Sequence, residues 1–439
     1  MGKLMKNMSP GRIIALGFAS MIFIGSGLLM MPVSIQPGQE IRYIDALYTA
    51  ASAVCVTGLV TIDPGTAFTP VGRFFLGLMI QLGGLGVATV GVGVMLAVGR
   101  KINLKGRNLI QEAGNLANGR GAIRFVRRVL GTTLVIELLG AALCMPVFLR
   151  DYSPLQALGY SAFHSVSAFN NAGFEILGHS GTLLANNNLF AYHDNVLMNL
   201  VTTALVIFGG LGFLVIQEMG KHKFRWRNYS MHAKVVLTTT LALLIAGTVL
   251  IKLTEPSETW MGAWFHSVAT RTAGFSTTDI GTYSDAGLLT MIVFMIIGAS
   301  PGSTGGGIKT TTFFVVLQGI LSAATNRDEK AFRYSIPKGL FRKSAIILLL
   351  ALGVVLIGTW GMLVMEPQVT FVQALFEISS ALGTAGLSTG ITAGLSTGSK
   401  LLTIVIMYIG RLGPLTIATL WYFAKVERIR YPEGNIAIG

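Results

Sequence analysis

The stretch SVATRTAGF, residues Ser267–Phe275, is the segment around which this chain is organised. Related stretches occur three more times: SAVCVTGL at 52–59, SVSAFNNAGF at 165–174 and SSALGTAGL at 379–387. Each has a glycine beside its last residue, and the four glycines are separated by 115, 101 and 112 residues. Self-similarity at a nearly constant spacing indicates that one structural unit is repeated. The sequence therefore predicts four copies of a unit built around a glycine loop.

The composition is that of an integral membrane protein. Charged residues make up 12% of the 439 residues, against about 25% in soluble domains, and the mean hydropathy is +0.65. The net charge of +14 comes from basic residues in loops between apolar runs, which favours a topology signal over nucleic-acid binding. Cys55 and Cys144 both lie in apolar sequence, so neither a disulfide framework nor a metal cluster is indicated.

Each unit is predicted to contain a first span, a half-helix, a glycine loop and a second span. The half-helices have about 12 residues, whereas about 20 are needed to cross a membrane, so they are predicted to be re-entrant. The first spans are predicted at 13–31, 129–149, 235–252 and 344–364, the half-helices at 43–54, 154–168, 258–269 and 370–381, and the second spans at 74–98, 195–216, 286–321 and 400–424. The units are 1–98, 129–216, 235–321 and 344–424, with linkers at 99–128, 217–234 and 322–343 and a tail at 425–439.

The basic residues predict the orientation of these spans. Of 33 Lys and Arg residues, 25 lie in the N-terminal segment, the linkers and the tail, and five lie in the opposite loops or span ends. By the positive-inside rule, this bias predicts eight transmembrane helices with both termini cytoplasmic. The first apolar run has 19 residues, longer than the about 7–15 of a signal peptide, and no small-residue cleavage site follows. We therefore expect it to be the first span.

Four glycine loops around one axis would form a cation pathway with fourfold pseudosymmetry. A ring of carbonyl oxygens can replace the hydration shell of a cation, and glycine allows the backbone angles that such a loop requires. Side chains at matching positions differ widely, which favours ligands from the main chain over a carboxylate cage. The predicted selectivity-filter residues are Val54, Cys55, Val56, Thr57, Gly58, Phe169, Asn170, Asn171, Ala172, Gly173, Thr270, Arg271, Thr272, Ala273, Gly274, Leu382, Gly383, Thr384, Ala385 and Gly386.

Four motifs give the chain a family resemblance: TRTAGF at 270–275, NNAGF at 170–174, GGGIKTTTF at 305–313 and GRLGPLT at 410–416. With these, nearly the whole chain resembles the Trk/Ktr/HKT superfamily of K+ transporters, whose fold is all-α with four units of two spans and a pore loop. The tail sequence RYPEG at 430–434 resembles the Ktr-type bacterial membrane subunit.

The resemblance implies a K+ uptake protein of the bacterial plasma membrane, stimulated by Na+ and without an organic cofactor. It implies a homodimer on an octameric cytosolic ring of nucleotide-binding RCK subunits of the KtrA or KtrC type. In plant relatives, serine at the first filter glycine accompanies Na+ preference. All four positions are glycine here, which favours K+.

The segment GASPGSTGGG, residues 298–307, interrupts the last apolar tract of the third unit. Non-helical backbone at membrane depth must face a cavity or protein, so we predict a gate below the filter, with a simple helix kink as the alternative. The resemblance agrees, since the family has an intramembrane loop here. The predicted gate residues are Gly298, Ala299, Ser300, Pro301, Gly302, Ser303, Thr304, Gly305, Gly306, Gly307, Lys309 and Arg411.

Three basic residues lie within the predicted membrane region. We expect Arg411 to face the cavity below the filter and to contact the gate, as its counterpart does in the resembling family; packing against an acidic residue is the alternative. Lys309 is expected either to line the inner vestibule or to hold the gate, and a snorkelling lysine is the alternative. Arg271 is expected to point away from the axis toward a carbonyl or acidic partner, with Glu377 and Asp45 as candidates.

Other polar residues have two interpretations. Glu137 is either hydrogen-bonded between helices or a Na+ or gating site. His164 and His266 occupy matching places and are interpreted as structural copies, not metal ligands. The echoes GGLG at 83–86 and 209–212 and GRLG at 410–413 are consistent with small-residue helix packing.

Two other functions compete with a pore. A coupled secondary transporter also has repeats and broken helices, but four units of one orientation favour a pore. A membrane enzyme would require a nucleophile or metal motif, and the chain has neither HExxH nor a Ser/His/Asp grouping. No GxGxxG fingerprint occurs in a strand–turn–helix context, so nucleotide control would come from another chain.

Overall fold

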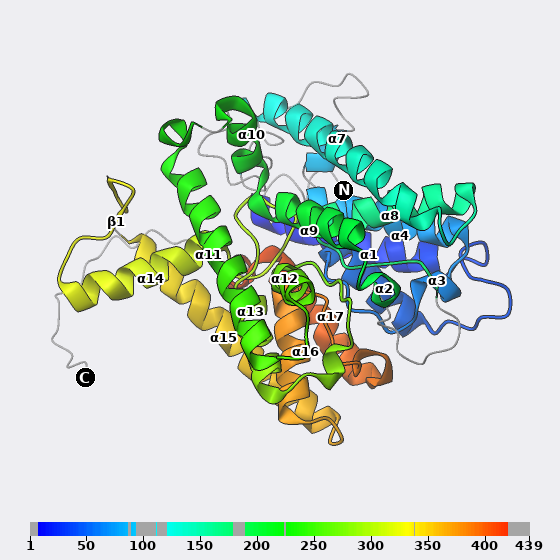
Figure 1. Cartoon of the computed structure of the whole chain (residues 1–439). Coiled ribbons are helices and arrows are strands. Elements are labelled where there is room, and N and C mark those ends of the chain that lie inside the picture. Colours follow the sequence, from blue (N-terminus) through cyan, green and yellow to red (C-terminus); the bar gives the residue numbers. More distant parts are fainter. Residues whose placement is uncertain are drawn as a thin grey trace.

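The computed structural model is mainly helical and describes residues 8–86, 89–93, 111, 121–178, 189–223, 225–337 and 339–419 (Figure 1). Within these residues, four helices are long and apolar enough to cross a membrane: α1 (Pro10–Leu29), α7 (Ala122–Phe148), α11 (Met231–Thr254) and α15 (Leu340–Met365). Each overlaps a predicted first span. Leu138, Leu253 and Ile357 on three of them are 61%, 68% and 70% exposed, as expected for helices that face lipid.

Three of the half-helices begin at a serine or threonine cap, and all four end at the glycine loops. They are α2 (Tyr43–Cys55), α8 (Pro154–Phe169), α12 (Trp260–Ala269) and α16 (Phe371–Gly383). The Thr259 hydroxyl caps α12 by accepting from Gly262 N, and Thr370 forms a capping box with Gln373 at the start of α16. With 10 to 16 residues, these helices are about 15–24 Å long, too short to cross a hydrocarbon core of about 30 Å.

The second helices of the first, second and fourth units are shorter than the sequence predicts, whereas the third stops near the predicted interruption. These helices are α4 (Pro70–Leu85), α9 (Val196–Leu211), α13 (Asp285–Ile296) and α17 (Thr397–Leu412). We expected uninterrupted spans at 74–98, 195–216 and 400–424, but α4, α9 and α17 stop at glycines. Gly86, Gly212 and Gly413 have φ of +83°, +91° and +89°, a conformation in which a helix ends.

The breaks are sharp. Helix α9 and the following α10 (Phe213–His222) differ in direction by 102° at Gly212. Counting that pair as one span gives five candidate spans among the described residues. Between α13 and α14 (Thr310–Thr325), residues 297–309 are non-helical and include the whole predicted gate segment. A β-bridge between Ile297 and Ile308 joins the two ends of this segment.

The remaining elements are short. They are α3 (Pro64–Ala67), α18 (Pro414–Thr419), the 3-10 turns η2 (Phe190–Tyr192), η3 (Trp226–Asn228), η4 (Ile280–Thr282) and η5 (Thr392–Gly394), and the antiparallel strands β1 (Lys330–Ala331) and β2 (Tyr334–Ser335). Figure 1 shows α14 and β1 extending away from the main bundle. The predicted tail at 425–439 and most of the predicted linker at 99–128 lie outside the described residues.

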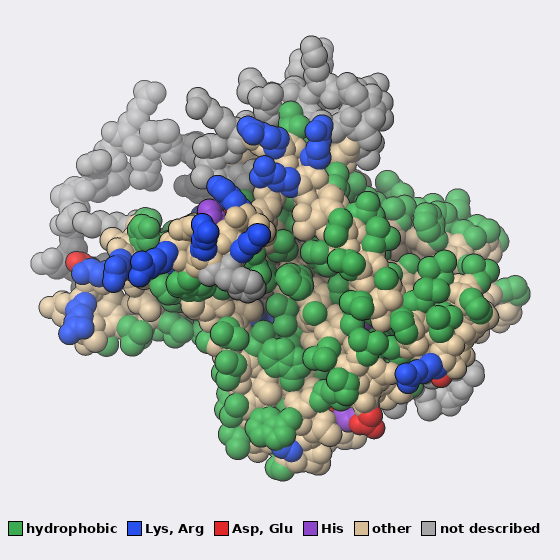
Figure 2. All heavy atoms as spheres, turned by 45° about the horizontal axis from the view of Figure 1, so that its top comes forward, with side chains coloured by type: hydrophobic (Ala, Val, Ile, Leu, Met, Phe, Trp, Pro, Cys, Tyr) green, Lys and Arg blue, Asp and Glu red, His purple; other side chains and the backbone are tan. Residues whose placement is uncertain are grey.

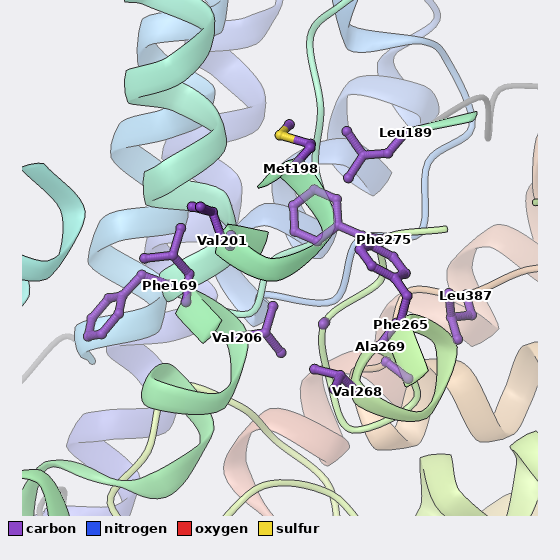
Figure 3. Packing of buried hydrophobic residues seen from close by; sticks show 14 of the residues in the cluster. Phe169, Leu189, Met198, Val201, Val206, Phe265, Val268, Ala269, Phe275 and Leu387 are labelled. Atoms are coloured by element: carbon purple, nitrogen blue, oxygen red, sulfur yellow. The ribbon is translucent and has the colours of Figure 1, made fainter. Parts of the chain in front are cut away.

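The surface and core agree with a membrane protein. Figure 2 shows a broad hydrophobic surface, with most of the visible Lys and Arg side chains gathered toward one side. The largest buried cluster joins residues of all four predicted units, among them Leu85 from the first, Phe169 from the second, Phe275 from the third and Leu387 from the fourth. Figure 3 shows part of it, including Phe169, Phe275 and Leu387. This shared core holds the glycine loops of different units against one another.

Candidate functional site

The four loop glycines meet in a closed ring. A Cβ on Gly58 would lie 3.1 Å from the Cα of Gly173, and one on Gly173 would lie 2.6 Å from the Cα of Gly274. A Cβ on Gly274 would lie 3.2 Å from the Cα of Gly386, and one on Gly386 would lie 3.0 Å from the Cα of Gly58. The ring therefore follows the order of the chain and closes the last loop onto the first.

The four loops share one backbone conformation. The glycines have φ of +95°, +68°, +77° and +79° in chain order. The residues two places earlier, which are Val56, Asn171, Thr272 and Thr384, have φ of +56°, +57°, +72° and +50°. Positive φ is uncommon outside glycine, and strained backbone gathers at functional sites. The same sign of φ at four matching positions, which carry valine, asparagine and two threonines, indicates that the main chain is the common feature of this site.

Glycines of the second helices support the loops from behind. A Cβ on Gly83, Gly209 or Gly410 would collide with the carbonyl oxygen of the residue four places before a ring glycine: Val54, Phe169 and Leu382, respectively. These are the first glycines of the three echoed motifs, and the last glycines of the same motifs end the helices. In the repeated GGLG and GRLG motifs, the first glycine therefore allows close contact between helix and loop, and the last glycine marks a helix break.

Arg271 has carbonyl partners. Its guanidinium donates to Thr240 O at 3.3 Å and to Gly298 O at 3.4 Å, on α11 and on the non-helical segment. The acidic candidates have other partners: Asp45 accepts from Lys400, and the Glu377 carboxylate accepts from Ser388 and Thr392. The suggestion that either carboxylate braces Arg271 was therefore wrong.

The sequence interpretation missed a buried ion pair. Lys400 Nζ lies 2.7 Å from Asp45 Oδ1, and the two residues are 1% and 5% exposed. Lys400 lies in the first turn of α17, and the ion pair joins the fourth predicted unit to α2 of the first. The partners are 355 positions apart, so no local pattern could have revealed the pair.

Glu137 joins three helices of the first two units. Its carboxylate accepts from Gln81 Nε2 at 3.2 Å and from Asn170 Nδ2 at 3.1 Å, and Asn170 also donates to Gln81 Oε1 at 2.7 Å. These contacts agree with the interpretation that Glu137 is hydrogen-bonded between helices. Because Asn170 belongs to the predicted filter, this network attaches the second glycine loop to α4 and α7.

The two matching histidines make hydrogen-bond contacts from the half-helices α8 and α12. His164 Nε2 is 2.9 Å from the Thr202 hydroxyl on α9, and His266 Nε2 is 3.1 Å from the Ser276 hydroxyl. Across the described ranges, no group of three or more His, Cys, Asp or Glu residues is arranged to hold a metal ion. The contacts fit a structural role at both positions.

The predicted gate segment lies against loops of three units. Thr304 N donates to Gly209 O at 3.2 Å, and the Thr304 hydroxyl donates to Phe169 O at 3.2 Å. Gly306 N donates to the Thr384 hydroxyl at 3.0 Å. A Cβ on Gly305 would collide with the side chain of Thr272. The segment therefore touches predicted filter residues of the second, third and fourth units.

Arg411 and Lys309 hold this segment in place. The Arg411 guanidinium donates to Thr304 O, to Gly83 O, and to Gly84 O at 3.0 Å, so it connects the segment to α4. Lys309 Nζ donates to two carbonyl oxygens of the segment, at 2.7 and 3.2 Å. The expected contact between Arg411 and the segment is present, and the hydrogen bonds of both cations go to carbonyl groups.

Comparison with known proteins gives concordant matches. The TrkH family, described as cation transport protein, matches residues 12–231 and 220–427. The chain is 38% identical to "Ktr system potassium uptake protein B" of Bacillus subtilis, covering 98% of this chain and 97% of the relative. It is 34% identical to "Ktr system potassium uptake protein D" of the same organism, covering 100% and 99% of the two chains.

Two further matches extend the comparison. "Potassium/sodium uptake protein NtpJ" of Enterococcus hirae is 34% identical, covering 99% of this chain and 98% of the relative. The crystal structure of the potassium transporter TrkH from Vibrio parahaemolyticus superposes with a TM-score of 0.72 at 18% identity, covering 95% of this chain and 86% of that chain. At that identity, the structural match supports the fold alone.

Proposed function

Because this chain belongs to the TrkH family of cation transport proteins, we propose that it is the ion-conducting membrane subunit of a Ktr-type potassium uptake system. The observation that carries the proposal is the closed ring of Gly58, Gly173, Gly274 and Gly386 in one repeated backbone conformation. In this proposal, the filter consists of residues 54–58, 169–173, 270–274 and 382–386. The four units have fourfold pseudosymmetry about the pore and together cross the membrane eight times.

Selectivity would come from the main chain. Carbonyl groups of the four loops would replace the water shell of K+ without introducing a fixed charge. The half-helices α2, α8, α12 and α16 end at these loops, and each helix C-terminus carries about half a negative charge, which favours a cation. Arg271 does not oppose this field at the axis, because its guanidinium is directed to Thr240 O and Gly298 O.

The gate would be residues 298–307, with Lys309 and Arg411 holding it. In support of this, the segment donates hydrogen bonds to Phe169 O and to the Thr384 hydroxyl, both in the proposed filter loops. A path for K+ would therefore require the segment to move, and the contacts of Arg411 to Thr304, Gly83 and Gly84 would have to break. Because a segment with five glycines in ten residues has few side-chain anchors, such movement is feasible.

The proposed assembly is the one that the resemblance to the Ktr type implies. The chain would form a homodimer in the bacterial cell membrane, with both termini cytoplasmic, on an octameric ring of nucleotide-binding RCK subunits. K+ would be the transported ion and Na+ an activator. Because one relative is named a potassium/sodium uptake protein, coupled Na+/K+ transport or Na+ permeation within the same family is the second candidate function.

The test is complementation of bacteria that lack K+ uptake, with and without a Ktr-type ring subunit. We expect growth at low K+, and we expect Gly173→Ala to abolish it, because the new Cβ would lie 2.6 Å from Ala273 O. Gly131→Ala is the matched control, since a Cβ at this lipid-facing position on α7 meets nothing within 4 Å. Absence of K+ uptake with the ring present, or equal uptake by both variants, would refute the proposal.

A further inference from the structure

A cavity of about 770 Å³ opens between α4 and α8, outside the proposed pore. Phe74, Leu78 and Phe163 are among the apolar residues that line it. Its lining also includes Arg73 and Gln156, near the first turns of the two helices, and Gln81 and Glu137 at greater depth. The cavity is therefore apolar along its length and polar at both ends.

The polar ends are separated along the helices. Arg73 and Gln81 are eight residues apart on α4, which corresponds to about 12 Å along the axis. On α8, Gln156 and Val166 are ten residues apart, or about 15 Å. The cavity thus extends from the N-terminal ends of both helices well into the depth of the hydrocarbon region.

The walls of the cavity are open to the surroundings. Leu155 on α8 is 81% exposed, and Phe74 on α4 is 66% exposed. The adjacent spanning helix α7 carries Leu134 and Leu138, which are also exposed. In a membrane-spanning protein, exposed apolar surface of this kind contacts lipid chains, because water is absent at that depth.

We propose that this cavity binds one phospholipid from the leaflet beside the N-terminal end of α4. An acyl chain would lie between α4 and α8, and the phosphate would be held by Arg73 and Gln156. The Arg73 guanidinium donates to Phe68 O at 2.9 Å and to Gly65 O, and these contacts fix its position. A guanidinium has five N–H donors, so it can bind a phosphate while keeping both contacts.

The deep end of the cavity can tolerate an acyl chain. Both oxygens of the Glu137 carboxylate already accept amide hydrogen bonds, from Gln81 and Asn170. The chain end would therefore lie beside a satisfied polar network. Since Asn170 belongs to the proposed filter, bound lipid would also stabilise the second filter loop, a consequence that rests on the proposed function.

The binding test uses purified protein and native mass spectrometry with phosphatidylglycerol as the probe. Gly159→Phe is expected to reduce retained lipid about tenfold, because residue 159 lines the cavity and a Cβ there meets nothing within 4 Å. Gly27→Phe is the matched control on α1, where a Cβ also has open space, and should retain lipid as the wild type does. Arg73→Gln should weaken retention about tenfold through loss of the charge-assisted contact.

Two results would overturn the proposal. One is equal lipid retention by the wild type and by folded Gly159→Phe, with Ala162→Phe as a second cavity-filling variant if the first does not fold. The other is efficient cross-linking of two copies through Gly159→Cys, which would show that a second copy covers the cavity. Lipid retention is measured without transport, so failure of the proposed K+ uptake would leave this result unaffected.

Discussion

Removal of the Arg411 guanidinium would test whether residues 298–307 close the conducting path. The guanidinium connects Thr304 O of that segment to Gly83 O and Gly84 O of α4. A hydrogen bond that involves a charged group contributes about 1.5–3 kcal/mol. Loss of the bond to Thr304 alone would therefore change the ratio of closed to open states by about 10- to 150-fold. We expect Arg411→Met to raise K+ flux in the absence of a ring subunit by about tenfold or more.

The assay is K+ flux into vesicles that contain the purified chain. Arg411→Lys should have an intermediate effect, because an ammonium group cannot reproduce the planar fork that reaches separate carbonyl groups. Lys309→Met should also raise flux, since it removes two bonds inside the segment. Lys252→Met is the matched control, because this lysine also donates to two carbonyl groups but in a loop remote from the segment. Flux in folded Arg411→Met at or below the wild-type level would refute the gate.

Three further predictions concern other parts of the chain. Gly58→Ser should lower K+ preference over Na+ in competitive uptake, because a side chain must adopt φ +95° and would crowd the ring; an unchanged ratio would contradict main-chain selectivity. Lys400→Met should lower the free energy of unfolding by about 3 kcal/mol, since it removes the buried partner of Asp45. Adding Asp45→Asn to that variant should recover part of the loss. If the effects of the two substitutions on the free energy of unfolding simply add, the two residues are not coupled. Burial alone would raise the pKa of Glu366, in the loop after α15, but hydrogen bonds from Ser396 outweigh it and hold that pKa below its usual value. The stability that this carboxylate contributes is present above the unfolded-state pKa and is lost as pH falls through the folded-state pKa. The midpoint temperature of thermal unfolding should therefore fall more steeply below about pH 4 in the wild type than in Glu366→Gln.

The half-helices were predicted almost to the residue. The expected ranges 43–54 and 154–168 correspond to α2 (Tyr43–Cys55) and α8 (Pro154–Phe169). Their length and ends depend on features that are local in sequence: a short apolar run, a polar cap or proline at the start, and a glycine loop at the end. Short-range backbone and capping interactions determine such elements, so sequence reasoning was sufficient there.

The ends of the second helices were not predictable in the same way. A glycine in an apolar helix can serve close packing, or it can end the helix with positive φ, and both uses have the same sequence signature. In GGLG at 83–86, the first glycine packs on Val54 O and the last ends α4 at φ +83°. Only the position of the neighbouring loop distinguishes the two roles.

By itself, the sequence indicated a membrane protein with four half-helices that end at related glycine loops, because hydropathy, repeat spacing and glycine placement are properties of short segments. The tertiary structure decided which groups meet: Lys400 with Asp45, Arg411 with α4 of the first unit, and Arg271 with carbonyl groups in place of a carboxylate. The physical reason is ring closure. Because the glycine loop of the last unit lies beside that of the first, partners more than 300 residues apart are placed in contact by packing that no local pattern records.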